Sequence, residues 1–281
     1  MKIRTKKTIG NIIYHTFVIA FGALMIYPVV WMILSSFKKK SEILGNSARF
    51  WPSEWVWQNY VEGWQGSGLV TFGTYFKNSF LVAGLGTIGT VLSSTMVAYG
   101  LARVKFRGRK FWFTCMILTM LLPGQVLMIP QYIIWNDLNL VGTYAPLILP
   151  KFLGWPFFIY MIMQFIRSLP KELDEAAEID GCSKYSIFTR IILPLLGPAL
   201  ITTTVISFYW IWDDYMGPLL YLTDPKMYTV SYAIKSFADV QGTNFGPMFA
   251  MSTLSLIPVF LLFLFFNRYL MDGVTAGSVK G

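Results

Sequence analysis

Five carboxylates crowd a short helix-forming segment of an otherwise apolar chain. The segment reads ELDEAAEID, and its carboxylates are Glu172, Asp174, Glu175, Glu178 and Asp180. Most charge runs are solvated surfaces, so an amphipathic surface loop is one interpretation of this segment. The other interpretation is a contact surface through which a second polypeptide supplies energy. The choice between the two depends on what the rest of the chain is.

Patterns for catalysis or metal binding do not occur in the sequence. It contains no GxxxxGK[ST] phosphate loop, no HExxH and no GxSxG. The two cysteines, Cys115 and Cys182, form no CxxC, and the one histidine, His15, lies in an apolar run. Neither a zinc site nor a disulfide framework is indicated. We expect a chain that is not an enzyme and binds no metal or cofactor itself.

Composition places the chain in a membrane. It is 55% hydrophobic and 13% charged, whereas soluble domains carry about 25% charged residues. Six apolar runs approach the length of about 20 residues that a membrane-spanning helix needs. They cover residues 12–34, 78–102, 111–130, 145–166, 198–222 and 247–266. The expected fold is an all-α membrane protein with six transmembrane helices in one domain, residues 1–281.

Basic residues set the expected orientation. If both termini are cytoplasmic, most of the 23 Lys and Arg residues fall on the cytoplasmic side, as the positive-inside rule requires. The cluster Lys38, Lys39 and Lys40 opposes the rule, but it opens a loop of nearly forty residues. The net charge of +9 therefore follows from topology, and no nucleic acid partner is expected.

In this topology the acidic segment belongs to a cytoplasmic loop, residues 167–196, between the fourth and fifth spans. We expect Ser168 to cap a first helix that has Pro170 in its first turn and ends at Gly181. Ser183 then caps a second helix that leads into the fifth span. The result is a helix–glycine–helix elbow beneath the membrane.

Two patterns lie inside the spans. Small residues recur every fourth position in the second span, at Gly86, Thr90, Ser94, Ala98 and Ala102, which predicts a face for close helix packing. Several prolines interrupt other spans, and they indicate kinks or a water-accessible path.

Aromatic and acidic residues gather near the end of the fifth span. They are Tyr209, Trp210, Trp212, Asp213, Asp214 and Tyr215. Aromatic faces with polar groups suit sugars, and carboxylates at membrane depth normally face a cavity or a partner. The alternative is an aromatic belt at the outer interface. We expect Asp213 or Asp214 to face a translocation cavity.

The elbow also fits a specific pattern: EAA, three residues, Gly, nine residues, I-x-LP. Glu175-Ala176-Ala177, Gly181, Ile191 and Leu193-Pro194 match it without a gap. The chain thereby resembles the permeases of binding-protein-dependent ABC importers. The segments ELDEAAEIDGCS, WIWDDYMGPLLYLTD and GVTAGSVKG resemble their carbohydrate-importing branch, to which the maltose importer belongs.

This resemblance implies that the elbow is a coupling helix seated in a cleft of a separate ATP-binding subunit. Small Ala176 and Ala177 would permit close docking, and Glu175 would pair with a basic residue of that subunit. Gly181 would permit the turn. Asp180 and Arg190 would brace the two arms of the elbow. In some members of the family the C-terminal tail, here GVTAGSVKG, also reaches toward the ATP-binding subunits.

The implied assembly contains a second, homologous permease in a heterodimer, two ATP-binding cassette subunits that bind ATP and Mg, and an extracellular solute-binding protein. It would sit among the lipids of the bacterial cytoplasmic membrane and import a sugar or oligosaccharide. Two alternatives remain open. The chain could be an autonomous secondary carrier or channel, or an ABC importer permease for a non-sugar solute.

Overall fold

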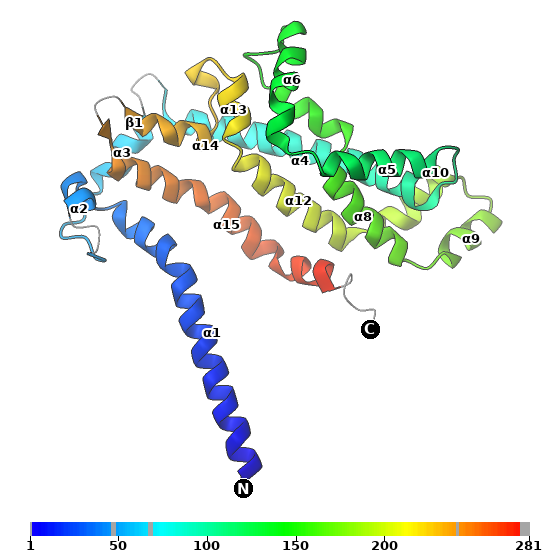
Figure 1. The fold of residues 1–281 in the computed structure, drawn as a ribbon, viewed down its shortest axis with the longest axis horizontal. Coiled ribbons are helices and arrows are strands. Elements are labelled where there is room, and N and C mark those ends of the chain that lie inside the picture. Colours follow the sequence, from blue (N-terminus) through cyan, green and yellow to red (C-terminus); the bar gives the residue numbers. More distant parts are fainter. Residues whose placement is uncertain (1, 46–48, 67–69, 240–241, 276–281) are drawn as a thin grey trace. The chain divides into compact units, whose positions relative to one another are not determined.

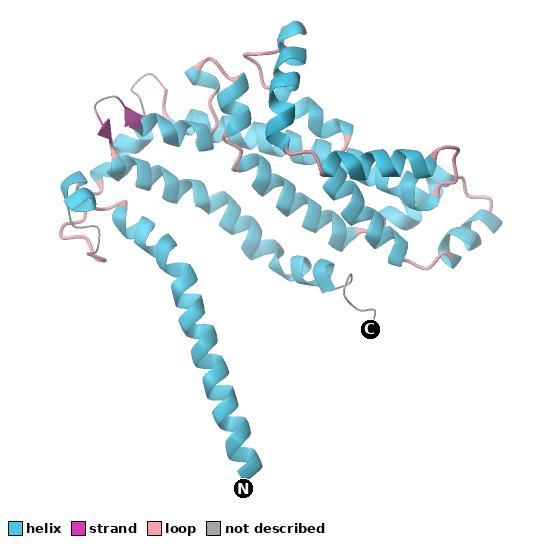
Figure 2. Cartoon of the chain, in the orientation of Figure 1, coloured by secondary structure: helices cyan, strands magenta, loops and turns pink. Residues whose placement is uncertain are grey.

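Helices dominate the computed structural model, which describes residues 2–45, 49–66, 70–239 and 242–275 (Figure 2). The chain divides into two compact units. Unit 1 comprises Met1–Phe72 and Ile234–Leu256, and unit 2 comprises Gly73–Ala233 and Ile257–Gly281. Within the described residues, the strands are a two-residue antiparallel pair, β1 (Ala238–Asp239) and β2 (Gly242–Thr243).

Unit 1 begins with the long N-terminal helix (Figure 1). Its helices are α1 (Lys2–Ser35), α2 (Lys40–Gly45), α3 (Gln58–Gln65), the 3-10 turn η4 (Ile234–Phe237) and the first part of α15 (Phe245–Thr275). The end of α1 depends on a buried amide. Asn59 Nδ2 donates to the carbonyl oxygens of Ser36, at 2.8 Å, and Lys38, at 3.0 Å. These carbonyls follow a helix end, where backbone acceptors lack helical partners.

Gly246→Ala is expected to destabilise unit 1. A Cβ at position 246 would lie 2.5–2.7 Å from the amide atoms of Asn59, so Asn59 would have to give up its two hydrogen bonds. Leaving buried polar groups unpaired costs about 1–3 kcal/mol. The purified chain should melt at a lower temperature. Gly22→Ala is the matched control, because nothing lies within 4 Å of a Cβ there; equal melting of the two variants would contradict this role for Asn59.

Unit 2 holds most of the remaining helices. Up to the elbow they are α4 (Phe72–Arg103), α5 (Arg109–Met120), α6 (Gly124–Asp137), α7 (Ala145–Ile148), the 3-10 turn η1 (Leu149–Leu153) and α8 (Pro156–Ser168). The elbow contains α9 (Glu172–Ile179), α10 (Lys184–Ile187), the π-helical turn η2 (Phe188–Ile192) and α11 (Leu193–Leu195). Then follow α12 (Gly197–Trp212), α13 (Met216–Tyr221), η3 (Pro225–Met227) and α14 (Val230–Ala233).

Four helical segments of the described chain are long and apolar enough to cross a membrane. They are Gly10–Ser35, Phe72–Arg103, Ala145–Ser168 and Phe245–Arg268. Two bent pairs raise the number to six if each pair is one span: Arg109–Met120 with Gly124–Asp137, and Lys184–Leu195 with Gly197–Trp212.

The expected span 111–130 is not one straight helix. α5 and α6 meet at an angle of 104°, and the break falls at Pro123, whose ψ of 130° is extended. Proline has no amide hydrogen for the helix, and it disfavours helical conformation in the residue before it. The fifth span also differs from expectation: α12 ends at Trp212, and the separate helix α13 begins at Met216.

The small face of α4 packs as its spacing predicts. Thr90, Ser94 and Ala98 are fully buried. Two glycines on this helix leave no room for a side chain: a Cβ on Gly86 would lie 2.9 Å from Ile211 Cδ1, and one on Gly89 would lie 2.5 Å from Phe152 Cδ2. Close approach of η1 and α12 to α4 therefore requires these small residues.

Candidate functional site

The elbow lies at one end of unit 2 (Figure 1) and packs on a hydrophobic core. This core joins α4 to α8 and continues into both arms of the elbow. Its fully buried or nearly buried members are Ala98, Tyr99, Leu101, Ile159, Ile162, Met163, Ile166, Ala177, Ile187, Ile192 and Leu196. Because the elbow contributes Ala177 and Ile187 to this core, it is a packed extension of the helices and not a loose loop.

A glycine turn ends the first arm, as expected. Gly181 has φ +79°, in the left-handed region, and its N–H donates to Glu178 O at 3.1 Å. The N–H of Cys182 reaches Ala177 O at 2.9 Å. This pair of hydrogen bonds is a Schellman motif, which satisfies the last carbonyls of a helix when the following residue adopts the left-handed conformation.

The second arm begins with the expected cap. Ser183 is extended, and its Oγ accepts a hydrogen bond from the Ser186 N–H at 3.2 Å. The arm then runs through η2 and α11 and meets α12 at an angle of 75°. It thus leads into the fifth span directly.

The expectation that Ser168 caps the first arm is wrong. Ser168 is the last residue of α8, and its Oγ donates back to Phe165 O at 2.7 Å. α9 begins after Lys171 and has no side-chain cap. Pro170 explains the shift, because it holds Leu169 in an extended conformation (ψ 141°) and so separates α8 from α9.

The two faces of α9 differ in exposure. Ala177 is 5% exposed and packs in the core, so the expectation that it faces a partner is wrong. Its helical spacing from Asp174 places both on the inner face, toward α4 and α8. The outer face shows Glu175, Ala176 and Ile179 to solvent, and Ile179 is 87% exposed. Beyond the bend, Tyr185 is 74% exposed.

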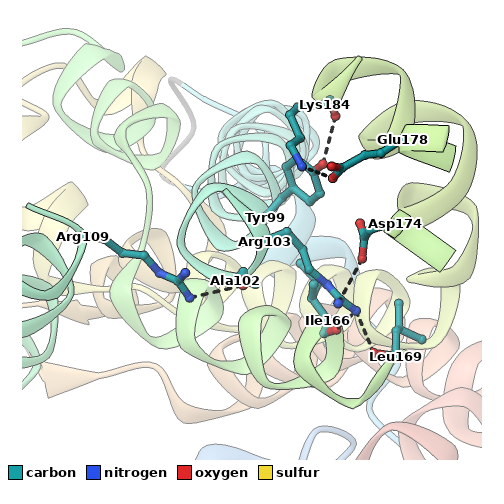
Figure 3. Close-up of polar contacts among 9 residues, drawn as sticks. All are labelled: Tyr99, Ala102, Arg103, Arg109, Ile166, Leu169, Asp174, Glu178 and Lys184. Carbon is teal, nitrogen blue, oxygen red and sulfur yellow. Dashed lines mark hydrogen bonds and ion pairs between the residues drawn. The ribbon is translucent and has the colours of Figure 1, made fainter. Parts of the chain in front are cut away.

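Ion pairs and one hydrogen bond tie the elbow together and to α4 (Figure 3). Glu178 and Lys184 form an ion pair across the bend. The expected brace between Asp180 and Arg190 is not formed within the described residues, where both side chains are exposed. Tyr99 Oη donates to Lys184 O at 2.9 Å, and Arg103 Nη1 lies 3.0 Å from Asp174 Oδ2. The end of α4 therefore contacts both arms.

A cavity of about 280 Å³ lies elsewhere in unit 2, between α4, α6, η1 and α13. Asp214, Lys151, Gln131 and Tyr221 supply its polar lining. Asp214 Oδ1 also accepts a hydrogen bond from the Gly217 N–H at 3.1 Å. The Lys151 ammonium lies 4.0 Å from the centroid of the Trp155 ring, which is cation–π geometry.

The structure separates the residues that sequence grouped as a substrate path. Asp214 lines the cavity, whereas Asp213 is exposed and does not line it. Trp212 is 5% exposed and stacks on Phe208 in the core. The others lie elsewhere: Tyr209 is exposed, Trp210 packs against Trp155, Phe157 and Phe158, and Tyr215 packs edge-on to Tyr232.

Three of the four polar cavity residues, Lys151, Gln131 and Tyr221, were not predicted as site residues. Lys151 carried a signal, because a charge that interrupts an apolar span is costly unless it faces a cavity or a partner. Gln131 carried none, since a single amide in an apolar run does not indicate which way it points. Gln131 reaches the cavity because the bend before α6 redirects that helix.

The model of one protein family matches residues 91–275 of the chain. It describes a binding-protein-dependent transport system inner membrane component. The matched range includes the whole elbow and α12.

Relatives match over nearly their full lengths. The probable ABC transporter permease protein YurM of Bacillus subtilis is 35% identical over 281 residues, which are 100% of this chain and 92% of the relative. The arabinooligosaccharides transport system permease protein AraQ of Halalkalibacterium halodurans is 34% identical over 91% of each chain. The trehalose/maltose transport system permease protein MalG of Thermococcus litoralis is 34% identical over 94% of each chain.

Two solved structures share the fold. A bacterial ABC transporter involved in the import of the acidic polysaccharide alginate matches with a TM-score of 0.80 at 19% identity, over 94% of this chain and 97% of that chain. A bacterial alginate ABC transporter in complex with an alginate pentasaccharide-bound periplasmic protein matches with a TM-score of 0.68 at 17% identity, over 94% of each chain.

Proposed function

Because the chain belongs to the family of binding-protein-dependent transport system inner membrane components, we propose that its elbow couples ATP hydrolysis on a partner subunit to the import of a sugar or oligosaccharide. The chain is a multi-pass membrane protein and a permease of an ABC importer. Its own role is the passage of the solute, and the ATPase activity belongs to the partner.

The elbow is the observation that carries this proposal. Its inner face is packed into the core of unit 2, and its outer face leaves Glu175, Ile179 and Tyr185 exposed. Large apolar and aromatic side chains exposed together on one face are typical of a protein contact surface. A force applied to that surface would pass through the packed inner face into α4, α8 and α12.

The proposed assembly has four further chains. A homologous permease forms the other half of the path, two ATP-binding cassette subunits bind ATP and Mg and receive the elbows, and a solute-binding protein delivers the cargo outside the membrane. One solved relative of the fold holds a periplasmic protein with an oligosaccharide, which supports the last of these. Both termini are proposed to be cytoplasmic, in the cytoplasmic membrane. The tail GVTAGSVKG is proposed to reach the ATP-binding subunits, and its residues 276–281 lie outside the described residues.

Carbohydrate is the proposed cargo because relatives named for arabinooligosaccharides and for trehalose and maltose match over more than nine-tenths of the chain. The polar groups that line the cavity are of the kinds that bind a carbohydrate. The cavity offers a carboxylate, an ammonium, an amide and a phenol, and these groups can hydrogen-bond to hydroxyls.

Reconstitution tests the proposal against the alternative of an autonomous carrier. Vesicles that contain this chain alone should take up no radiolabelled maltotriose or arabinotriose, with or without an ion gradient. Vesicles with all subunits, internal ATP and loaded binding protein should take up one of a panel of neutral and acidic oligosaccharides. Uptake by the chain alone would contradict the proposal, and uptake of only amino acids or phosphate by the full complex would contradict the sugar assignment.

Asp214→Asn is expected to weaken import about 10- to 100-fold, because hydrogen bonds to charged groups contribute about 1.5–3 kcal/mol. The amide oxygen can still accept the hydrogen bond from Gly217, so the local fold should be retained. The initial rate of uptake at low substrate concentration measures the effect. Asp213→Asn is the control, since Asp213 lies outside the cavity lining. Equal rates for the two variants would remove Asp214 from the path.

A further inference from the structure

We propose that Arg103 is the positioning residue that makes the first arm of the elbow move as one body with α4 and α8. The inference deepens the proposed function and rests on it, because it assigns the transmission of force to one guanidinium. Arg103 is the last residue of α4, at the point where that helix meets the elbow (Figure 3).

One side chain joins three helices. Arg103 Nη2 donates to Ile166 O at 2.9 Å and to Leu169 O at 2.7 Å, both at the C-terminal end of α8. Its Nη1 lies 3.0 Å from Asp174 Oδ2, in the first turn of α9. The carbonyls at the end of a helix lack helical donors and carry partial negative charge. From the end of α4, Arg103 therefore binds both the carbonyl end of α8 and the Asp174 carboxylate of α9.

The contacts of Arg103 fix the orientation of α9 relative to α8, which the short connection between the two helices does not determine. Three residues, 169–171, connect α8 to α9, so the connection limits how far the helices can separate but not how they are oriented. The planar guanidinium presents its donors in a rigid fork. Nη2 holds α8 through two hydrogen bonds, and Nη1 holds α9 through the ion pair with Asp174. Rotation of α9 about the connection would separate the charges of this pair.

Burial makes the contact rigid. The side chains of Arg103 and Asp174 are 7% and 13% exposed, whereas the ion pair of Glu178 and Lys184 across the bend is about half exposed on both sides. Exposed pairs contribute little and are easily replaced by water. Breaking a buried pair leaves an uncompensated charge. The first arm is thus fastened to α4 by Arg103 and the second by Tyr99 Oη, one helical turn away.

Site-directed labelling in the assembled importer tests this role without knowledge of the cargo. Met128, which lines the cavity, is changed to Cys in a chain whose Cys115 and Cys182 are replaced by Ser. The rate of labelling by a membrane-impermeant maleimide is compared without nucleotide and after trapping with Mg-ATP and orthovanadate. In the parent chain, trapping should change the rate at least fivefold, the lower end of typical coupling between sites.

Arg103→Gln should bring the ratio of the two rates close to one, while the amount of assembled complex and of trapped nucleotide stays normal. Asp174→Asn should act in the same direction, and Arg103→Lys should give an intermediate ratio because it keeps the charge and loses the fork. A purely structural role would lower the amount of complex and leave the ratio unchanged. If the Arg103→Gln chain does not assemble into the complex, Arg103→Lys and Asp174→Asn test the proposal in its place. A ratio of labelling rates equal to that of the parent chain in both of these variants would overturn the proposal.

The double variant Arg103→Gln with Asp174→Asn separates rigid connection from an unpaired charge. It contains no buried charge at these positions, so recovery of the parent ratio would overturn the proposal, and a ratio as low as in the single variants supports it. Arg109→Gln is the matched control. Arg109 lies close to Arg103 in sequence, but its guanidinium donates to Ala102 O on its own side of the bend and forms no ion pair within the described residues. The ratio of labelling rates in Arg109→Gln should therefore equal that of the parent chain.

Failure of the inference can be told from failure of the proposed function. A parent-like ratio in Arg103→Gln, while Glu175→Lys no longer binds the ATP-binding subunit, would overturn only the role of Arg103. A ratio of one in the parent chain itself would overturn both.

Discussion

Glu175→Lys is expected to abolish ATP-driven import while the chain still inserts into the membrane in normal amounts. Glu175 is exposed on the outer face of α9, and it forms no ion pair within the described residues. Substitutions at such positions usually change the free energy of unfolding by less than about 0.5 kcal/mol. The damage should therefore fall on the interface with the ATP-binding subunit and not on the fold.

The size of the effect follows from the proposed contact. Removing a carboxylate from a desolvated pair with a basic residue in a protein interface costs about 2–5 kcal/mol, because the basic residue is left buried and unpaired, and a lysine in its place adds repulsion. Co-purification of the ATP-binding subunit should fall at least about 100-fold, because each 1.4 kcal/mol is tenfold in affinity. Co-purification with Glu175→Gln should lie between the levels of the unmodified chain and Glu175→Lys, since glutamine removes the attraction without adding repulsion.

Asp137→Lys is the matched control for this prediction. It makes the same reversal of charge at an exposed carboxylate, at the C-terminal end of α6 and outside the elbow. Import and co-purification should stay at the level of the unmodified chain. Loss of import in both variants, or normal import with Glu175→Lys, would show that Glu175 does not contact the ATP-binding subunit.

Local signals predicted the elbow well. A glycine after an acidic helix and a serine two residues later determine the bend, because a left-handed residue and an N-cap each act on their own few hydrogen bonds. Gly181 and Ser183 behave as expected for this reason. Ser168 does not, because the same serine suits the end of α8, where its Oγ donates to Phe165 O, and Pro170 separates α8 from α9.

Contacts between distant segments could not be predicted in the same way. Helical spacing puts Ala176 and Ala177 on adjacent faces, but it does not say which face meets α4. The pairing of Asp174 with Arg103 joins residues 71 positions apart, and no spacing rule connects them. The cavity could not be predicted either, because distant segments form it. Asp214 lines it from the break between α12 and α13, and Lys151 lines it from a 3-10 turn.

α4 links these two regions of unit 2. Near its middle, Ser93 Oγ donates to Lys151 O at 3.0 Å, and Ser94 Oγ accepts from the Trp155 N–H at 3.3 Å. At its end, Tyr99 and Arg103 hold the two arms of the elbow. A rigid helix with a small, tightly packed face would carry a displacement of the elbow to the cavity wall. This gives a physical path for the proposed coupling.

Gly181→Pro is expected to abolish import through the shape of the elbow alone. Gly181 has φ +79°, whereas proline is held near −65°. Proline would also remove the N–H that bonds Glu178 O, so the turn between the arms cannot form. The arms would adopt another angle, and Glu175 and Tyr185 could no longer present one surface to the ATP-binding subunit.

A graded series at Gly181 distinguishes backbone shape from steric contact. Nothing in this chain lies within 4 Å of a Cβ at this position, so an effect of a side chain on the elbow itself comes from the positive φ. Gly181→Asn should retain most import, because asparagine tolerates the left-handed region. Gly181→Ala should lower import in part, since that region costs alanine about 1–2 kcal/mol. Rates of uptake in the order Gly, Asn, Ala, Pro support the prediction. Normal import with proline would show that the bend is not the coupling element, whatever else the elbow does.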